Sequence, residues 1–198
     1  MKAEDATEYM DREKTEDRFK TRAAIAIACF AALLAITGLG GNNATKEALN
    51  ENVLASNDFT FFQAKNQRQT AYILAANELE LSLNNPALSE EAKAAIAKRV
   101  DDYRKTVTRY ESEPETGEGK KELLTRAREH QVKRDHALKQ DPYFDYSEAL
   151  LQIAIVLISV AIVSEQIWLS FLGGGVGLIG AVLMLNGFLL FVEIPGLG

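Results

Sequence analysis

Three long stretches of this sequence carry no charged residue, and they constrain the fold more than any other feature. They cover residues 23–45, 149–164 and 166–192, whereas nearly all of the charge lies before and between them. A helix needs about 20 apolar residues to cross the hydrocarbon core of a bilayer, and only a helix or a closed barrel satisfies its own backbone hydrogen bonds there. The distribution therefore excludes a single soluble globular domain and predicts an integral membrane protein.

These runs predict three transmembrane helices, at residues 23–41, 148–169 and 173–193. Residues 1–22 are expected to form a charged helix before the first span, and residues 42–147 an extramembrane domain. A cleaved signal peptide is the alternative for the first run, but the leader carries seven acidic residues and no small-residue cleavage site follows it. The predicted fold class is all-α, with an extramembrane helical hairpin between the first and second spans.

The second span is expected to end in a polar turn of helix. Glu165 follows Ala149 by sixteen residues, or about 24 Å along a helix, so its carboxylate should lie near the membrane surface and not at the costly bilayer centre. Residues 170–175 are then the glycine-rich turn to the third span. Interfacial belts are expected to hold four aromatic side chains, Tyr143, Phe144, Tyr146 and Trp168.

Basic residues near the first span give an expected orientation. The N-terminal 22 residues contain six Lys and Arg, against one in the twenty residues after the span and four in the twenty before residue 148. Arg18, Lys20 and Arg22 form a cationic collar directly before the apolar run. Because such residues favour the cytoplasmic side, the N-terminus is predicted to be cytoplasmic and residues 42–147 periplasmic.

The segment between the first two spans is predicted to be helical. Its 106 residues include 16 basic and 18 acidic side chains and show no strand alternation. Residues 44–83 lack both Pro and Gly and predict one long helix, which the Asn-Asn-Pro sequence at 84–86 ends. The apolar stripe of this helix is assigned to Leu54, Phe61, Phe62, Gln69, Tyr72, Ala76, Leu79 and Leu83.

A second helix is expected to begin after Ser89, whose hydroxyl suits an N-cap, with Glu90 and Glu91 in the first turn. Apolar side chains recur along it at alternating steps of four and three residues, which is the spacing of a coiled-coil seam. The expected partner is the preceding helix, so that the two form a hairpin. The seam residues are Ile96, Val100, Tyr103, Val107 and Tyr110.

An acidic linker at residues 113–119 separates this helix from a third, more polar helix at residues 120–140. Asp141 and Pro142 are predicted to cap and open the second membrane helix, because Pro is favoured at the first helical position. The third helix has few apolar residues to bury, namely Leu123, Leu124, Ala127, Ala137 and Leu138.

Composition excludes several classes of protein. With 22 Lys and Arg against 28 Asp and Glu there is no basic excess to bind nucleic acid. The single cysteine, Cys29, excludes a disulfide framework and a cysteine-based zinc site. His130 and His136 lie six residues apart and cannot share a metal on one helix face, so both are expected at the surface. No catalytic residue, metal or cofactor is predicted.

Small residues in the spans predict close approach of helices. The spacing of Gly175, Gly177 and Gly180 matches the dinucleotide fingerprint, but no strand precedes it, so helix packing is the preferred interpretation. An alanine face on the first span leaves two alternatives open, packing within the chain or contact between subunits. The residues assigned to helix packing or oligomer contacts are Ala24, Ala28, Ala32, Gly173, Gly177 and Gly180; the polar residues assigned to the spans are Gln152, Ser159, Glu165 and Asn186.

Two short motifs resemble a known family. One is Ser56-Asn57-Asp58-Phe59-Thr60-Phe61-Phe62-Gln63-Ala64-Lys65, and the other is Tyr143-Phe144-Asp145-Tyr146 before the apolar sequence from Leu151 to Leu157. They are similar to motifs of the bacterial membrane proteins of domain-of-unknown-function family 4337, with Asn57 and Phe59 where that family has Asp and Trp. The resemblance covers about residues 23–187. It implies a bacterial inner-membrane protein of this helical layout, without an assigned activity.

Two hypotheses for function follow. The preferred one is a non-enzymatic scaffold or accessory subunit that binds proteins through its helices, as a homo-oligomer or within a larger membrane complex. The alternative is an oligomeric conduit for ions or small solutes, lined by Gln152, Ser159, Glu165 and Asn186. The chain is also expected to contact the lipid bilayer. It is not expected to bind nucleic acid.

Overall fold

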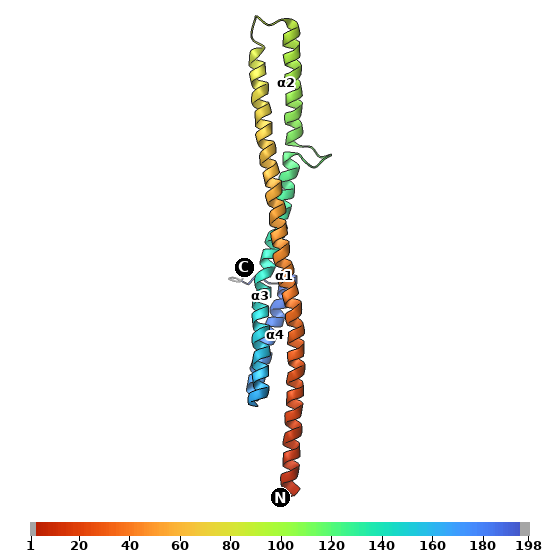
Figure 1. The fold of residues 1–198 in the computed structure, drawn as a ribbon, viewed down its shortest axis with the longest axis vertical. Helices are drawn as coiled ribbons and strands as arrows, with labels where there is room; N and C mark the ends of the chain where they lie inside the picture. The colour runs from red at the N-terminus through yellow and green to blue at the C-terminus, as the bar shows by residue number, and fades with distance from the viewer. Residues whose placement is uncertain (1–2, 195–198) are drawn as a thin grey trace. The chain divides into compact units, whose positions relative to one another are not determined.

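A computed structural model describes the backbone of residues 3–194 and the side chains of residues 14–194. Over this range all regular secondary structure is helical, as the sequence predicts, with no strand (Figure 1). The four helices are α1 (Ala3–Ser82), α2 (Glu90–Glu111), α3 (Lys120–Ser164) and α4 (Ile167–Leu189). By length and composition, α1, α3 and α4 each contain a segment apolar enough to cross a membrane.

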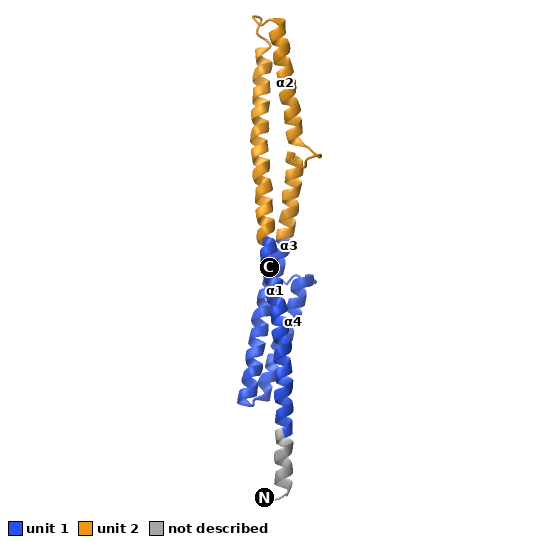
Figure 2. Cartoon of the chain, turned by 45° about the vertical axis from the view of Figure 1, so that its right-hand side comes forward, with its two compact units in different colours: residues 1–48, 135–198 blue, residues 49–134 orange. Residues whose placement is uncertain are grey.

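The chain divides into two compact units, which Figure 2 colours separately. Unit 1 comprises residues 1–48 and 135–198, and it contains the three apolar segments. Unit 2 comprises residues 49–134, and it contains α2 with the adjoining parts of α1 and α3. Both long helices thus contribute to both units.

In unit 2, α1 and α2 pair as the predicted hairpin. The loop between them contains the Asn-Asn-Pro sequence, and the Ser89 hydroxyl accepts a hydrogen bond of 3.2 Å from the Ala92 amide, which confirms the predicted N-cap. Tyr103 and Tyr110 of α2 pack edge-on against Tyr72 of α1, with ring centroids 5.2 and 5.9 Å apart. The α2 face predicted from its four-and-three spacing is therefore the face that contacts α1.

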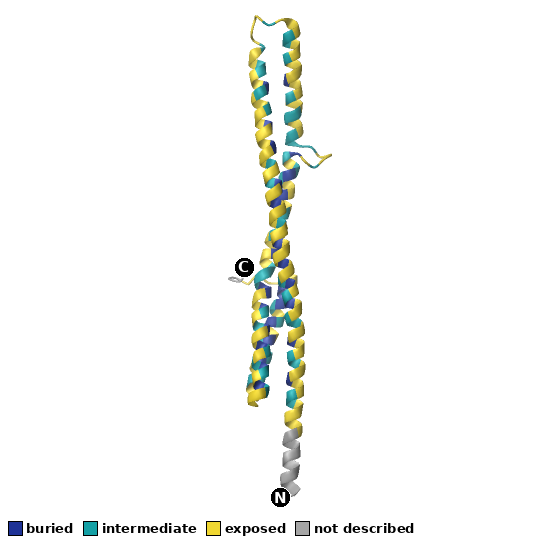
Figure 3. Cartoon of the chain, viewed as in Figure 1, coloured by how far each residue is buried: buried dark blue, intermediate teal, exposed yellow. Residues whose placement is uncertain are grey.

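The inward face of α1 differs from the predicted apolar stripe. Leu54 and Phe61 are exposed, whereas Ala55, Asp58 and Lys65 are buried. The inward positions recur every seven residues within each unit (Figure 3): 23, 30, 37 and 44 in unit 1, and 55, 62, 69 and 76 in unit 2. Gln69 and Ala76 of the predicted stripe are buried, as expected, but the prediction missed Ala55, Asp58 and Lys65.

Helix α3 continues through Pro142, so the predicted helix boundary at Asp141 is wrong. Proline removes one backbone donor, but Tyr143 and Phe144 beside it are buried and their packing keeps this turn of helix in place. The Asp141 carboxylate accepts a 2.8 Å hydrogen bond from the Thr45 hydroxyl and does not cap a helix. Leu138, which was expected to be buried, is half exposed.

The turn between the last two helices lies earlier than predicted. Helix α3 ends at Ser164, Glu165 adopts a left-handed conformation with φ of 55°, and Gln166 is the N-cap of α4. The glycine-rich residues 170–175 therefore lie inside α4. Gly173 is helical because it packs on α3, where an added Cβ would lie 2.8 Å from the Ile158 side chain.

In unit 1, Phe144 of α3 occupies a slot between two glycines. An added Cβ would lie 2.6 Å from its ring at Gly40 of α1 and 2.9 Å from it at Gly187 of α4. The ring also packs edge-on against Phe188, with centroids 4.8 Å apart. Tyr143 and Phe144 are thus core residues of unit 1.

Candidate functional site

The densest group of buried polar side chains lies in unit 2, where the segment between α2 and α3 docks against α1. The centre of this docking site is Lys65, whose side chain is only 11% exposed. Its ammonium nitrogen lies 3.8 Å from a carboxylate oxygen of Glu113 and 3.6 Å from one of Glu118. One cation on α1 thereby holds both ends of the intervening loop.

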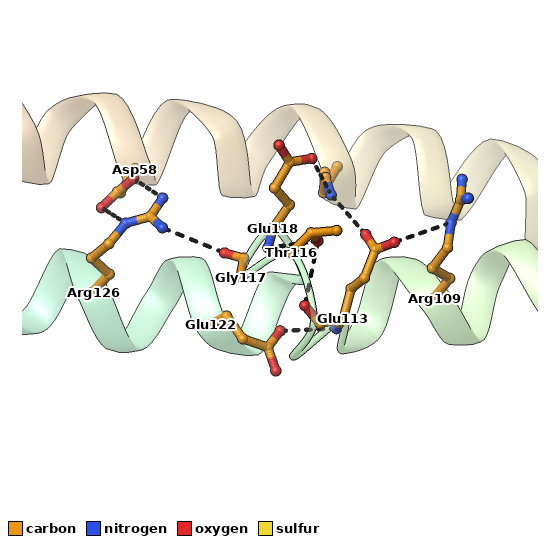
Figure 4. Close-up of polar contacts among 9 residues, drawn as sticks. Asp58, Arg109, Glu113, Thr116, Gly117, Glu118, Glu122 and Arg126 are labelled. Atoms are coloured by element: carbon orange, nitrogen blue, oxygen red, sulfur yellow. Dashed lines mark hydrogen bonds and ion pairs between the residues drawn. The ribbon is translucent and has the colours of Figure 1, made fainter.

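Asp58 and Arg126 join α1 to α3 on one side of Lys65. The Arg126 guanidinium donates hydrogen bonds of 2.8 and 2.6 Å to the two carboxylate oxygens of Asp58, as Figure 4 shows. Because Asp58 is buried, desolvation acts to raise its pKa, but the hydrogen bonds from Arg126 outweigh this and lower it. The pair is bidentate, which constrains orientation as well as distance.

A histidine extends this network. The Nδ1 atom of His130 lies 2.5 Å from a carboxylate oxygen of Glu51, and its Nε2 atom lies 3.9 Å from Asp58. The side chain of His130 is 17% exposed, so the expectation of a surface histidine is wrong for this residue. His136 is exposed, as expected.

On the other side of Lys65, Gln69 joins α1 to both α2 and α3. Its amide nitrogen donates to the backbone carbonyl of Val107, at 2.9 Å, and to the Glu111 carboxylate, at 3.1 Å. Its amide oxygen accepts a 2.6 Å hydrogen bond from the Lys120 ammonium group. Hydrogen bonds from Gln69 and then Lys120 lower the pKa of Glu111. A single amide thus bridges the end of α2 and the start of α3.

The loop itself is closed by Glu122. This carboxylate accepts a 2.6 Å hydrogen bond from the Ser112 hydroxyl and one of 3.1 Å from the Glu113 amide. Both bonds stabilise the charged form, so the pKa of Glu122 is lowered. Gly119 must be glycine here, because an added Cβ would overlap the Glu122 carboxylate and the Glu113 backbone.

The family motif on α1 has one face toward this docking site and another toward the surface. Lys65 is buried against the loop, and the half-buried ring of Phe62 lies 5.8 Å from the Lys120 ammonium nitrogen. Phe61, Gln63 and Ala64 face outward and are exposed. The motif therefore divides into residues that hold the α2–α3 segment and residues available at the surface.

The polar contacts of the docking site hold helix segments together. Among the described residues, no buried side-chain nitrogen or oxygen atom lacks a hydrogen-bond partner, and no group of His, Cys, Asp and Glu could hold a metal ion. A buried charge such as that of Asp58 or Lys65 is costly to leave without its partner, so these ion pairs oppose a shift in helix register. The arrangement fixes how three helix segments align.

The four polar residues assigned to the spans do not come together. Gln152 is exposed and bonds to Glu148 on its own helix, and Ser159 donates to the backbone carbonyl of Ile155. Glu165 lies in the α3–α4 turn. Asn186 forms two hydrogen bonds with the Val192 backbone, at 2.8 and 3.0 Å, and so closes the C-terminal end of α4.

The small residues assigned to helix packing divide between two environments. Gly173, Gly177 and Gly180 are buried within the chain, against α3 or against Phe30 of α1. The alanines of α1, in contrast, are not covered by α3 or α4 and are exposed in this chain: Ala24, Ala28 and Ala32.

Sequence reasoning missed two polar groups. Glu51 and His130 belong to the docking site, and Thr37, Ser147 and Gly180 form a buried polar junction in unit 1. There the Ser147 hydroxyl donates to the Gly180 carbonyl at 2.8 Å and lies 3.4 Å from the Thr37 hydroxyl. A seven-residue spacing along α1 was a signal for the first group, because it marks one face of the helix without requiring large apolar side chains. This spacing includes Ala48, Ala55, Gln69 and Ala76.

Comparison with known proteins agrees with the motif resemblance. The family model described as "Domain of unknown function (DUF4337)" matches residues 19–190. No curated protein and no solved structure matches the chain. The family match includes the docking site and all three apolar segments. The chain therefore belongs to the family of domain of unknown function 4337.

Proposed function

We propose that this protein is a membrane-anchored scaffold or accessory subunit that binds protein partners through unit 2. In this proposal the apolar segments of unit 1 cross the bacterial inner membrane, and unit 2 is a coiled-coil-like helical hairpin in the periplasm. The N-terminus is cytoplasmic. The protein acts as a homo-oligomer or as part of a larger complex, and it has no catalytic role.

One observation carries the proposal. On the outer side of α1 in unit 2, large apolar side chains remain uncovered near both ends of the helix segment: Leu49 and Val53 at one end, and Leu74 and Leu81 at the other. Val53, Leu74 and Leu81 share one seven-residue register, in which the intermediate positions are the polar Thr60 and Gln67. Each of the four apolar side chains is more than half exposed. Because the inner face is occupied by α2 and α3, this outer stripe is free to bind another helix. Exposed apolar surface that recurs on one face is typical of a protein-binding site.

The contrast between the inner and outer faces of α1 supports a role in protein binding over a catalytic role. The inner face of α1 holds polar residues that bond to one another across the hairpin, among them Asp58, Lys65 and Gln69. The outer face holds the apolar side chains of Val53 and Leu74. A hairpin whose register is fixed from inside presents its outer stripe as a rigid surface, which lowers the entropic cost of binding.

Site-specific photo-crosslinking in cells tests this proposal. A benzophenone amino acid at Leu74, in the outer stripe, should give crosslinked products of discrete mass. The same amino acid at Asn66, which is exposed on a different face of α1, is the matched control and should give little product. Mass spectrometry of the products then distinguishes a second copy of this chain from another protein.

Two results would overturn the proposal. One is an equal, diffuse crosslinking pattern at Leu74 and Asn66, which would show that the outer stripe has no preferred partner. The other is a robust solute flux through purified protein in liposomes that is lost in Asn186→Leu, which would favour the conduit hypothesis instead.

A further inference from the structure

Unit 1 contains a groove of about 870 Å³ between the first turns of the apolar segment of α1, the start of α4 and Ile158 of α3. Its walls are largely apolar and include Phe19, Phe30 and Phe171. Two cations line it, Arg18 and Arg22, which lie four residues apart on the same face of α1. Among the side chains of residues 14–194, no carboxylate lines the groove.

The two arginines differ from the lysine between them. Lys20 is held by Glu16, and Glu16 together with Glu165 raises the pKa of Lys20. Among the side chains that the structure describes, Arg18 and Arg22 have no ion-pair or hydrogen-bond partner. Both guanidinium groups are therefore free to bind an anion at the groove, although Glu16, Asp17 and Glu165 lie close enough to Lys20 to act on its pKa.

Two glycines of α4, Gly174 and Gly175, are among the residues that line the groove. A Cβ added at Gly174 or Gly175 would meet no atom within 4 Å, so both positions open onto empty space. At Gly177, one turn further along α4, an added Cβ would overlap the Phe30 ring. The groove is thus open beside residues 174–175 and closed by Phe30 beyond them.

We propose that this groove binds an anionic phospholipid, with the headgroup phosphate on Arg18 and Arg22 and an acyl chain along Gly174 and Gly175. The inference rests on the proposed placement of unit 1 in a membrane. Charge complementarity identifies the occupant, because a basic mouth above an apolar cleft matches a phosphate joined to a hydrocarbon chain. Guanidinium groups also bind phosphate in a bidentate manner.

Quenching of tryptophan fluorescence by brominated lipids tests the proposal. Trp168, the single tryptophan, lies next to Ile167 and two residues before Ser170, both of which line the groove. The full chain is reconstituted in phosphatidylcholine vesicles, and brominated phosphatidylglycerol or brominated phosphatidylcholine is titrated in. We expect the anionic lipid to quench with a relative binding constant higher by up to roughly thirtyfold, from two basic contacts near a membrane surface.

Variants separate the groove from general attraction to the membrane surface. Arg18→Gln with Arg22→Gln should reduce the preference to nearly one, whereas Lys20→Gln, the matched control in the same helical turn, should retain it. Gly175→Leu should reduce quenching by both lipids, because its side chain fills the groove without meeting the fold. Circular dichroism confirms that each variant is folded.

An equal preference for the anionic lipid in the parent protein and in all variants would overturn the proposal, because the lipid would then surround the protein without binding in the groove. No preference in the parent protein would overturn it also. Carbonate extraction distinguishes the failure of this inference from the failure of the proposed function. A chain that stays in the membrane pellet without lipid preference disproves only the groove, whereas a chain released by carbonate disproves the membrane placement of unit 1.

Discussion

At the scale of single residues, the inner face of α1 in unit 2 is unusual because charged and amide groups occupy positions where a helical hairpin normally places apolar ones. Asp58, Lys65 and Gln69 are all buried, and each bonds to a residue of α2, of α3 or of the loop between them. Such groups add little net stability compared with apolar packing, but they penalise every misaligned register. Their role is to select one alignment.

The Asp58–Arg126 pair gives the first prediction. Arg126→Met leaves the buried Asp58 carboxylate without its bidentate donor and should lower the free energy of unfolding by about 2 kcal/mol, a typical cost for losing hydrogen bonds to a charged group. Thermal unfolding in detergent, followed by circular dichroism, measures the change. Arg128→Met, at an exposed position two residues away, is the control and should have little effect. Equal stability of both variants would show that the pair is only a surface contact.

The second prediction concerns pH. The pKa values of Asp58, Glu111 and Glu122 are lowered below their ordinary values of 3.8 for Asp and 4.5 for Glu. A carboxyl group with a lowered folded-state pKa stabilises the fold above its ordinary pKa, and this contribution is lost as the pH falls through the folded-state value. The melting temperature should therefore stay level from pH 7 to about 5.5 and fall below about 4.5. Asp58→Asn should reduce that fall, and a melting temperature that rises on acidification would contradict this assignment.

At the scale of elements, helix boundaries follow local chemistry where a cap is available and tertiary packing where it is not. The start of α2 is set by the Ser89 cap, whereas α3 runs through Pro142 because the adjacent Tyr143 and Phe144 are packed in the core of unit 1. The seam of α2 packs against α1 in unit 2. Val100 is its buried apolar residue, at 7% exposure.

A third prediction tests that seam. Val100→Asp places an unpaired carboxylate in the contact between α1 and α2 and should cost about 3 kcal/mol or more. Ala97→Asp, at an exposed position of the same helix, introduces the same side chain and should cost less than about 1 kcal/mol, chiefly through helix propensity. Thermal unfolding measures both. If the two variants have the same melting temperature, the face of α2 that carries Val100 is solvated.

At the scale of the whole molecule, the proposed crossing of a membrane by three apolar segments predicts that the two termini lie on opposite sides of it. The fourth prediction follows. Alkaline phosphatase fused at Gly117 or after the last residue should be active, as in the periplasm, and the same enzyme fused at the N-terminus should be inactive. A fluorescent reporter that folds only in the cytoplasm should give the reverse pattern. An inactive fusion at Gly117 would invert the assigned topology.

The fifth prediction concerns assembly. Ala24, Ala28 and Ala32 are exposed in this chain, so their small side chains are free to contact a helix of another subunit. Ala28→Leu should then push the subunits apart and shift the detergent-solubilised particle to a smaller mass, measured by light scattering. Cys29→Leu, at the neighbouring exposed position, is the control and should leave the mass unchanged. An unchanged mass in both variants would place lipid, and not protein, on the alanine face.

The sequence alone determined the helical class, the three apolar segments, the Ser89 cap and the α2 seam, because these depend on composition and on spacing along one helix. Only the tertiary structure decided which side of α1 faces inward, since Asp58 and Lys65 are buried by partners far along the chain, Arg126 and Glu118. It also decided that the glycine-rich residues 170–175 are helical and not a turn. A glycine's role depends on the surface that approaches it, and Gly173 has the Ile158 side chain of α3 against it.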